Sequence, residues 1–301
     1  MYRYRLYGLS IVSDLYFPQL VEETADMEGA PEIYVGVCEV PESIKHISDK
    51  KYDFGATFSW LSNLTTWLIV ENGNRIGYRL KEGGKVQALR NFILGFGMSM
   101  IAAQRGILSI HCSAVADGDG AVLIAGESGA GKSTLTTAFL ERGYHLMADD
   151  MAFVETVDKK LTYAYPAFPF QKLCRNVAIE KGYNLDDLIY INEDKDKFMV
   201  PYQGEFGLEK IPVKAFIMLG LTNNEEVEIK EIAGFDKFIV YANNLFLRHL
   251  LRERKYNPEF GQLCIEMAAN VPTYRIARPI EGDSTKQVAE EAFRIAGTVR
   301  K

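Results

Sequence analysis

The sequence lacks a cysteine framework. Four cysteines occur in the 301 residues, and they stand far apart, with no Cys-x-x-Cys pair and no Cys/His cluster: Cys38, Cys112, Cys174 and Cys264. A structural zinc site needs such a cluster, so none of this kind is expected. Stable disulfides belong mainly to oxidising compartments. The scattered cysteines therefore predict free thiols and a cytoplasmic protein.

The sequence also lacks a long apolar run and an excess of positive charge. Its longest apolar run covers residues 92–103, whereas a membrane span needs roughly 20 residues. Asp14 interrupts the apolar stretch near the N-terminus, so no secretory signal is expected. With 34 Lys and Arg against 40 Asp and Glu, the net charge is −6. We therefore expect neither a membrane nor a nucleic acid as a partner.

The first hundred residues are predicted to be rich in β-strands. Short bursts of apolar residues, several of them alternating with polar ones, predict strands at 4–12, 32–40, 58–61, 66–70 and 75–80. Asn72-Gly73 predicts a hairpin turn between the last two. Apolar residues at helical spacing then predict a buried helix over 87–104. Residues 1–105 are thus expected to form a β-rich accessory domain that ends in a helix.

A different pattern starts after Arg105-Gly106. Strands are predicted at 107–115, 121–125, 144–148, 152–156 and 213–221, and helices at 132–142, 172–181, 235–254, 258–269 and from 283 onward. Ser284 and Gln287 fit a capping box at the start of the last helix. Strands interleaved with helices are typical of an α/β domain. We predict that this domain spans residues 106–301, and two domains suit a chain of this length.

Residues 126–133, Gly-Glu-Ser-Gly-Ala-Gly-Lys-Ser, match the P-loop pattern for binding phosphate. Glycines let several backbone N–H groups turn toward one anion, and the following helix offers its N-terminus. A chance glycine-rich turn is the alternative, but an apolar strand before it and a helix after it favour the P-loop. The predicted ligands are ATP and Mg²⁺. The nucleotide-binding candidates are Gly126, Ser128, Gly129, Ala130, Gly131, Lys132, Ser133 and Thr134.

Paired carboxylates and one histidine add to this motif. Asp149 and Asp150 follow a predicted strand, at the end where open α/β sheets bind ligands. One carboxylate can hold Mg²⁺ while the other takes a proton from an acceptor hydroxyl. An exposed acidic turn is the alternative. His111 lies on the strand before the motif, where a catalytic and a structural role are equally compatible with the spacing.

Together these residues resemble the catalytic domain of HPr kinase/phosphorylase, whose fold is similar to that of ATP-dependent phosphoenolpyruvate carboxykinase. The resemblance is carried by His111, the 126–133 motif, Arg142-Gly143 and Ala148-Asp149-Asp150, in that order and spacing. It implies catalytic roles for His111, Lys132 and Asp149, with Asp149 as the base. It implies Ser133 and Asp150 as metal ligands.

Two departures separate the chain from the bifunctional HPr enzymes. Residues 168–175 lack their glycine-rich signature, and Thr134 stands where they typically have Glu. These departures argue against phosphorylase activity and against HPr as the acceptor. The N-terminal pattern Tyr7-Gly-Leu-Ser and the segment leading into His111 look more like the kinases of lasso-peptide precursors. That group implies a peptide substrate.

The leading hypothesis is therefore an ATP- and Mg²⁺-dependent kinase that phosphorylates a Ser hydroxyl on a peptide or small protein. A ribosomally made precursor peptide of the lasso type is the acceptor that the resemblance implies. Two alternatives stay open: a nucleotide-sensing binding module, and a small-molecule kinase of the same fold. The paired aspartates argue against a pure sensor, which needs no base. A homo-oligomer is compatible with the analogy to HPr kinase.

Overall fold

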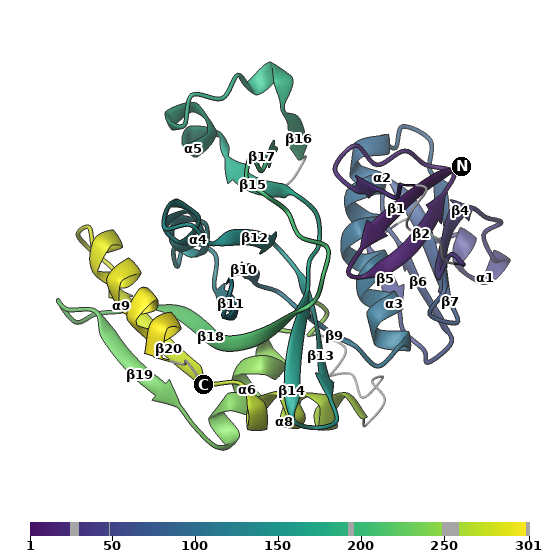
Figure 1. Cartoon of the computed structure of the whole chain (residues 1–301). Helices are drawn as coiled ribbons and strands as arrows, with labels where there is room; N and C mark the ends of the chain where they lie inside the picture. The colour runs from purple at the N-terminus through teal and green to yellow at the C-terminus, as the bar shows by residue number, and fades with distance from the viewer. Residues whose placement is uncertain (25–29, 48, 192–195, 249–258, 299–301) are drawn as a thin grey trace. The chain divides into compact units, whose positions relative to one another are not determined.

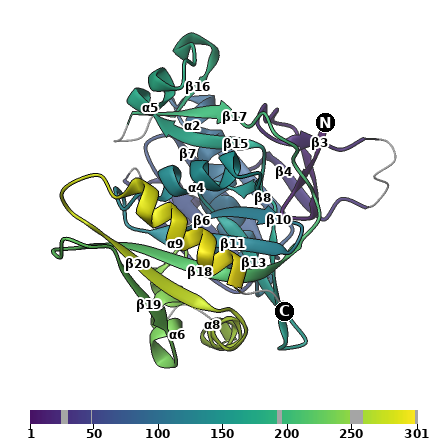
Figure 2. The same ribbon diagram turned by 60° about the vertical axis from the view of Figure 1, so that its left-hand side comes forward.

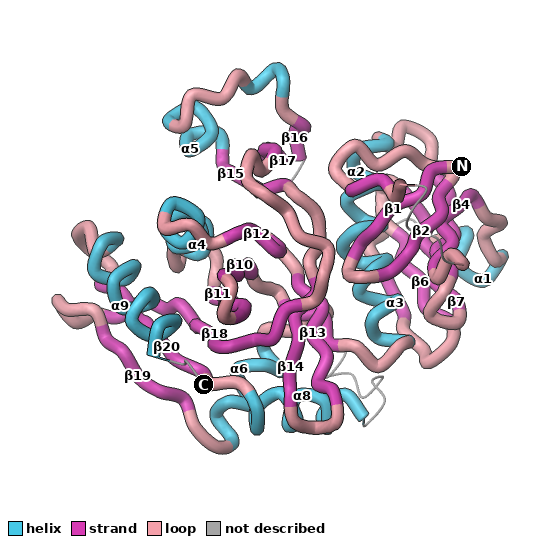
Figure 3. Tube along the Cα trace, in the orientation of Figure 1, coloured by secondary structure: helices cyan, strands magenta, loops and turns pink. Residues whose placement is uncertain are grey.

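The computed structural model describes residues 1–24, 30–47, 49–191, 196–248 and 259–298, and these residues form a mixed α/β protein with several sheets (Figures 1 and 3). Their contacts divide the chain into two compact units. Unit 1 comprises Met1–Ile107, Phe170–Pro201 and His249–Glu259, and unit 2 comprises the rest of the chain. Residues 170–201, which the sequence analysis places in the second domain, thus group with unit 1.

Unit 1 is built on an eight-stranded sheet with the order β3-β1-β2-β4-β8-β7-β6-β5. Its strands are β1 (Tyr2–Leu6), β2 (Leu9–Ser13), β3 (Val21–Glu22), β4 (Ile33–Val37), β5 (Lys51–Asp53), β6 (Phe58–Ser62), β7 (Thr66–Glu71) and β8 (Arg75–Leu80). The short helix α1 (Glu42–Lys45) follows β4. Most pairs are antiparallel, but β4 runs parallel to both β2 and β8.

Turn chemistry explains one confirmed and one wrong prediction in this sheet. The hairpin around Asn72-Gly73 is confirmed: both residues have positive φ, 52° and 63°, as a tight turn between twisted strands requires. The single strand predicted over 4–12 is wrong. Tyr7 and Gly8 also have positive φ, so the chain reverses there, and β1 and β2 pair as a hairpin.

The helix predicted over 87–104 is confirmed. It comprises α2 (Val86–Phe92), the π-helical turn η1 (Ile93–Gly97) and α3 (Met98–Gln104). A Cβ on Gly97 would lie 3.3 Å from Ile76 on β8, so the helix packs closely on the sheet. Val86–Gln104 is the one described helix long and apolar enough to cross a membrane, with half of its most apolar window buried. Buried core helices meet the same criteria.

Residues 170–201 form a three-stranded antiparallel sheet with the order β15-β17-β16. Its elements are β15 (Phe170–Cys174), α5 (Arg175–Glu180), the 3₁₀ turn η2 (Leu185–Asp187), β16 (Ile189–Ile191) and β17 (Lys197–Pro201). The helix predicted over 172–181 therefore starts too early. Lys172 pairs with Met199 on β17, and this pairing holds the start of the segment in a strand.

Unit 2 is built on a nine-stranded sheet, in which β12-β10-β11-β18-β14-β13-β9 is the main path and β20 joins β18 to β19. Its strands are β9 (Leu108–Ile110), β10 (Ser113–Asp117), β11 (Gly120–Gly126), β12 (His145–Ala148), β13 (Ala152–Val157), β14 (Leu161–Tyr165), β18 (Ile211–Thr222), β19 (Glu228–Ile232) and β20 (Thr273–Pro279). Strands β12, β11, β18 and β20 run in one direction, because β18 is parallel to β11 and β20, and β10 is antiparallel to β11 and β12. Their carboxyl ends therefore share one edge of the sheet.

Helices cover both faces of this sheet (Figure 2). On one face lie α4 (Lys132–Glu141) and α9 (Thr285–Thr298), and their apolar side chains pack with Ile124 and Ile217 in one buried cluster. Phe139 of α4 meets Phe293 of α9 edge to face at 5.0 Å. On the other face lie α6 (Phe235–Asn243) and α8 (Glu259–Asn270), with Tyr241 against Phe216 at 5.0 Å. Removing a ring such as Phe139 would cost about 3–5 kcal/mol.

Two sequence predictions in unit 2 are wrong in detail. The strand predicted over 107–115 is two strands: β9 pairs with β13, and β10 pairs with β11. The helix predicted over 235–254 ends at Asn243, because the Asn244 side chain donates to its own turn at Val240 O and the chain then bridges to β9. Residues 249–254 of that prediction lie outside the described residues.

The capping box predicted for the last helix does not form. The backbone N–H of Thr285 donates to Asp283 Oδ1 at 2.9 Å, so the side chain before Ser284 takes the expected role. The Ser284 Oγ atom is buried and has no hydrogen-bond partner among the described residues. The helix itself begins at Thr285, close to the predicted start.

Candidate active site

The glycine-rich loop, residues 126–131, connects the carboxyl end of β11 to α4. A Cβ on Gly126 would lie 2.8 Å from the Leu219 carbonyl oxygen of β18, so only glycine fits there. Gly131, at the N-cap of α4, has φ of 105°, which other residues rarely adopt. These two glycines let the chain turn sharply from the sheet into the helix. The free N–H groups of the first helical turn are left to bind an anion.

Lys132 begins α4 and reaches back across the loop. Its Nζ donates to Gly126 O at 2.5 Å and approaches Glu127 O at 3.4 Å. The next two side chains, Ser133 and Thr134, are exposed at the start of the helix. The ammonium group is therefore positioned over the same turn that presents the helix N-terminus, and both attract negative charge.

The two aspartates lie at the same edge of the sheet. Ala148 at the end of β12 pairs with Ala114 of β10, and Ser113 Oγ donates to the Asp149 carbonyl at 2.9 Å. The Asp149 Oδ1 atom is buried, and the Asp150 side chain is about one-third exposed. Ser113 also pairs with Ile124 of β11. Only β10 therefore separates β12, which the aspartates follow, from β11, which leads into the loop.

His111 lies in the break between β9 and β10, which brings it to this edge. Its backbone N–H donates to Asn244 O at 2.7 Å, and its ring lies 6.0 Å from that of Phe246. Its Nδ1 is 3.7 Å from Asp150 Oδ1. The single strand predicted over 107–115 would not produce this arrangement. The ring lies beside Asp150 because the chain leaves β9, which pairs with β13, and enters β10, which pairs with β11.

The buried thiol of Cys112 lies near charged groups of both the loop and the aspartate pair. Burial raises the pKa of Cys112 to about 12, the positive charge of Lys132 lowers it, and the negative charge of Asp150 raises it. Both charges are thus close enough to act on one buried atom. Lys132, Asp150 and His111 therefore belong to a single charged region at the sheet edge.

The oxygen donors at this edge fit Mg²⁺. They are the carboxylates of Asp149 and Asp150 and the hydroxyl of Ser133, and all are hard ligands. Among the described residues, no group of three or more His, Cys, Asp and Glu is placed to hold a metal ion. Mg²⁺ in nucleotide sites usually takes only one or two carboxylates, with water and phosphate oxygens completing its shell.

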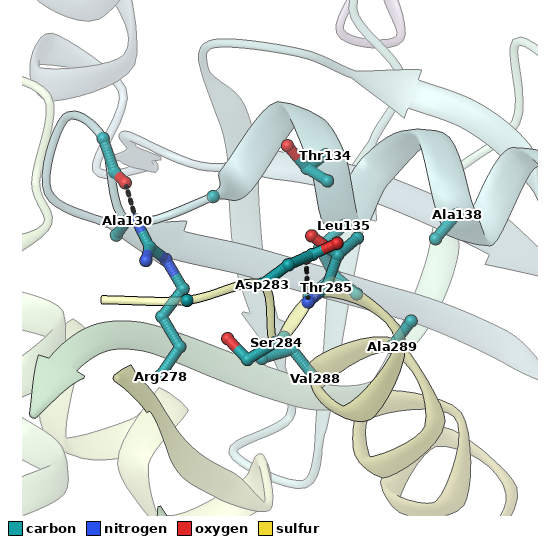
Figure 4. Close-up of a pocket in the computed structure, with 13 residues that line it drawn as sticks. Ala130, Thr134, Leu135, Ala138, Arg278, Asp283, Ser284, Thr285, Val288 and Ala289 are labelled. Carbon is teal, nitrogen blue, oxygen red and sulfur yellow. Dashed lines mark hydrogen bonds between the residues drawn. The ribbon is translucent and has the colours of Figure 1, made fainter. Parts of the chain in front are cut away.

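A cavity of about 280 Å³ lies beside the loop, between the N-terminal parts of α4 and α9 (Figure 4). Four predicted nucleotide-binding residues line it: Gly129, Ala130, Gly131 and Thr134. Sequence reasoning missed Arg278, whose Nη2 donates to Gly129 O at 2.9 Å. Arg278 follows the motif by more than a hundred residues, and no pattern in the residues around it indicates a role at the loop. The pairing of β20 with β18 brings it to the loop.

Comparison with known proteins adds little to this geometry. No family model matches the chain, and no curated protein matches it. A solved structure, the Hpr(Ser) kinase/phosphatase from Coxiella burnetii, matches 64% of this chain and 95% of its own, with 14% sequence identity and a TM-score of 0.32. A likeness this low carries no argument about function.

Proposed function

We propose that the chain is an ATP- and Mg²⁺-dependent kinase that transfers a phosphoryl group to a Ser hydroxyl of a peptide or small protein. The observation that carries the proposal is the shared sheet edge. It holds the glycine-rich loop with Lys132, the Asp149–Asp150 pair and His111. Phosphoryl transfer needs an anion cradle, a cation and a carboxylate base in one place.

In this proposal the loop and Lys132 bind the β- and γ-phosphates. Lys132 would exchange its bond to Gly126 O for phosphate oxygens, which carry more negative charge than a carbonyl. Asp150 and Ser133 would hold Mg²⁺, which supplies positive charge to the transferring group. Asp149 would accept the proton of the acceptor hydroxyl, and the anchoring of its carbonyl by Ser113 fixes where it stands.

His111 fits the role of a positioning group for Asp150. Its main chain is tied to Asn244, and Phe246 flanks its ring, so Nδ1 is held on the Asp150 side. A carboxylate whose direction is fixed loses less entropy on binding a metal ion. The peptide acceptor and a cytoplasmic location rest on the sequence resemblance and the cysteine pattern alone.

The test is phosphorylation of candidate peptides with Mg-ATP, followed by mass spectrometry. We expect the mass gain of one phosphoryl group on a Ser-containing peptide with the wild-type chain, and its loss with Lys132→Ala. Lys160→Ala is the matched control, because Lys160 is an exposed lysine on the β13–β14 turn. Transfer that persists in Lys132→Ala would contradict the assigned roles.

The nucleotide-sensing alternative makes the opposite prediction in the same assay. The chain would bind Mg-ATP but transfer phosphate to no peptide, protein or small-molecule hydroxyl. Transfer to a small molecule in place of a peptide would instead favour the small-molecule kinase. Equilibrium binding of ATP, measured beside the transfer assay, separates these outcomes.

A further inference from the structure

The outer face of α6 is apolar and open to solvent. It consists of four residues at helical spacing: Phe235, Phe238, Ile239 and Ala242. Phe235 is 72% exposed and Ile239 40% exposed, whereas Tyr241, on the other side of the helix, is fully buried against the sheet. A surface helix normally turns its polar side to solvent. An exposed apolar face of this kind indicates a binding partner.

The aromatic part of this face is ordered before any partner arrives. The rings of Phe235 and Phe238 lie 5.3 Å apart with an interplanar angle of 22°, so they stack on each other. Stacked rings lose little rotamer freedom on binding, and aromatic anchors contribute much of the energy of protein interfaces. Asp236 is exposed beside them in the first turn of the helix. The face therefore suits an apolar partner segment with a basic residue next to it.

The carboxyl end of α6 leads directly into the candidate active site. The helix ends at Asn243, and the Asn244 carbonyl accepts the backbone N–H of His111 at 2.7 Å. Phe246 then flanks the His111 ring, whose Nδ1 is 3.7 Å from Asp150 Oδ1. With nine residues at about 1.5 Å each, α6 is about 14 Å long. The outer face is thus continuous with the site along one helix.

We propose that the outer face of α6 is a docking surface for the acceptor peptide, which binds an apolar segment of the peptide while its Ser hydroxyl lies at Asp149. The proposal rests on the proposed function, because it needs a peptide acceptor. A length of about 14 Å corresponds to about four residues of extended chain. The apolar segment and the Ser are therefore separated by about four residues or more, and a small molecule cannot reach both places.

The test measures steady-state phosphorylation by the full chain at saturating Mg-ATP. Its substrate is the Ser-containing peptide that gains a phosphoryl group in the mass-spectrometric assay. Phe235→Ala removes the most exposed ring, and we expect the KM for the peptide to rise about tenfold, as on loss of an aromatic anchor. The kcat should change much less. Leu161→Ala, which removes an exposed apolar side chain from β14 of the same unit, is the matched control and should keep the wild-type KM.

Two further measurements make the test specific. Ile239→Ala removes a smaller and less exposed side chain, and we expect the KM for the peptide to rise about threefold. A shortened peptide that keeps only three residues on each side of the Ser should have a raised KM with the wild type. With this peptide Phe235→Ala should raise the KM no further, because the two changes remove the same contact.

The possible outcomes separate this proposal from the proposed function. If Phe235→Ala and Ile239→Ala both keep the wild-type KM, the docking surface is overturned while the kinase assignment stands. If the wild type is a dimer in analytical ultracentrifugation and Phe235→Ala is a monomer with an unchanged KM, the face binds a second copy of the chain instead. If the wild type phosphorylates no peptide, the proposed function fails and the docking surface fails with it.

Discussion

The charged groups at the two ends of the β10–β11 hairpin differ in how deeply they are buried and how closely they are paired. At the tight turn, Lys214 Nζ donates to both carboxylate oxygens of Asp117, at 2.6 and 2.7 Å, and approaches the Tyr144 hydroxyl at 3.4 Å. The Lys214 side chain is only 7% exposed. At the open end, His111 and Asp150 are 3.7 Å apart and each is at least one-third exposed.

The difference separates a buried ion pair that closes a turn from charged groups that are partly exposed at the sheet edge. Asp117 also accepts the N–H groups of Asp119 and Gly120, so its bonds close the turn. At the open end, Lys132 Nζ donates to Gly126 O and approaches Glu127 O, and both carbonyls belong to its own loop. Variants at the two ends should therefore separate activity from stability.

The largest expected effect is on catalysis at the open end. Asp149→Asn keeps the shape of the side chain but removes the proposed base, so we expect phosphoryl transfer to fall by about 10²–10⁴-fold. ATP affinity and the thermal unfolding midpoint should change little. Transfer rates with an acceptor peptide identified in the phosphorylation assay, measured at saturating ATP, check this. Activity within about threefold of wild type would remove Asp149 from the catalytic role.

At the turn, the expected effect is on stability. Lys214→Met leaves the Asp117 carboxylate partly buried without its cation, and we expect the free energy of unfolding to fall by about 3 kcal/mol. The transfer rate of the folded protein should be unchanged. Urea unfolding at pH 7 measures the loss.

The Lys214→Met, Asp117→Asn double variant is the control, because the Asn side chain can still accept the turn N–H groups without a buried charge. It should recover part of the loss. Equal stability of the wild type and the Lys214→Met variant would contradict the contrast between the two ends.

The sequence predicts local features of the fold well and long-range ones poorly. The Asn72-Gly73 hairpin and the helix over 87–104 depend on residues close in the chain, and both are confirmed. The break at His111 depends on β9 pairing with β13, more than forty residues away. Apolar alternation runs through the break, so the sequence shows no interruption there. Tyr7-Gly8 did carry a signal, since an isolated glycine inside an alternating stretch indicates an irregularity in the strand, such as a bulge.

The candidate site divides in the same way. Lys132, Ser133 and the loop glycines lie in one contiguous motif, so their proximity follows from the sequence. Arg278 and Ser284 reach the loop only through the pairing of β20 with β18 and the packing of α9 on α4. Ser284 was expected to cap its helix, and instead Asp283 accepts from Thr285 and leaves the hydroxyl buried in the cavity wall. Tertiary contacts decided this, and the local pattern does not contain them.

A smaller effect should test whether the open end is a metal-dependent site. Ser133→Ala removes one proposed Mg²⁺ ligand and leaves the loop and Lys132 in place. We expect the Mg²⁺ concentration for half-maximal transfer to rise by about tenfold, which corresponds to about 1.4 kcal/mol. Saturating Mg²⁺ should restore most of the rate. Thr137→Ala, further along the same helix, is the control, and an equal shift in both variants would contradict a specific role for Ser133.

The smallest expected effect is the pH dependence of the turn. Partial burial by itself would raise the pKa of Asp117, but hydrogen bonds from Lys214 and Tyr144 outweigh it and hold the pKa below its usual 3.8. A carboxyl with a lowered folded pKa adds stability above its unfolded pKa and loses it as the pH falls through the folded pKa. The stability difference between wild type and Lys214→Met should therefore be full at pH 7 and narrow below about pH 3.8. Urea unfolding of both proteins at pH 7 and in acid measures this difference in stability. Taking the difference cancels the effects of acid on other groups. A difference that stays constant with pH would show that the ionised pair of Asp117 and Lys214 does not supply this stability.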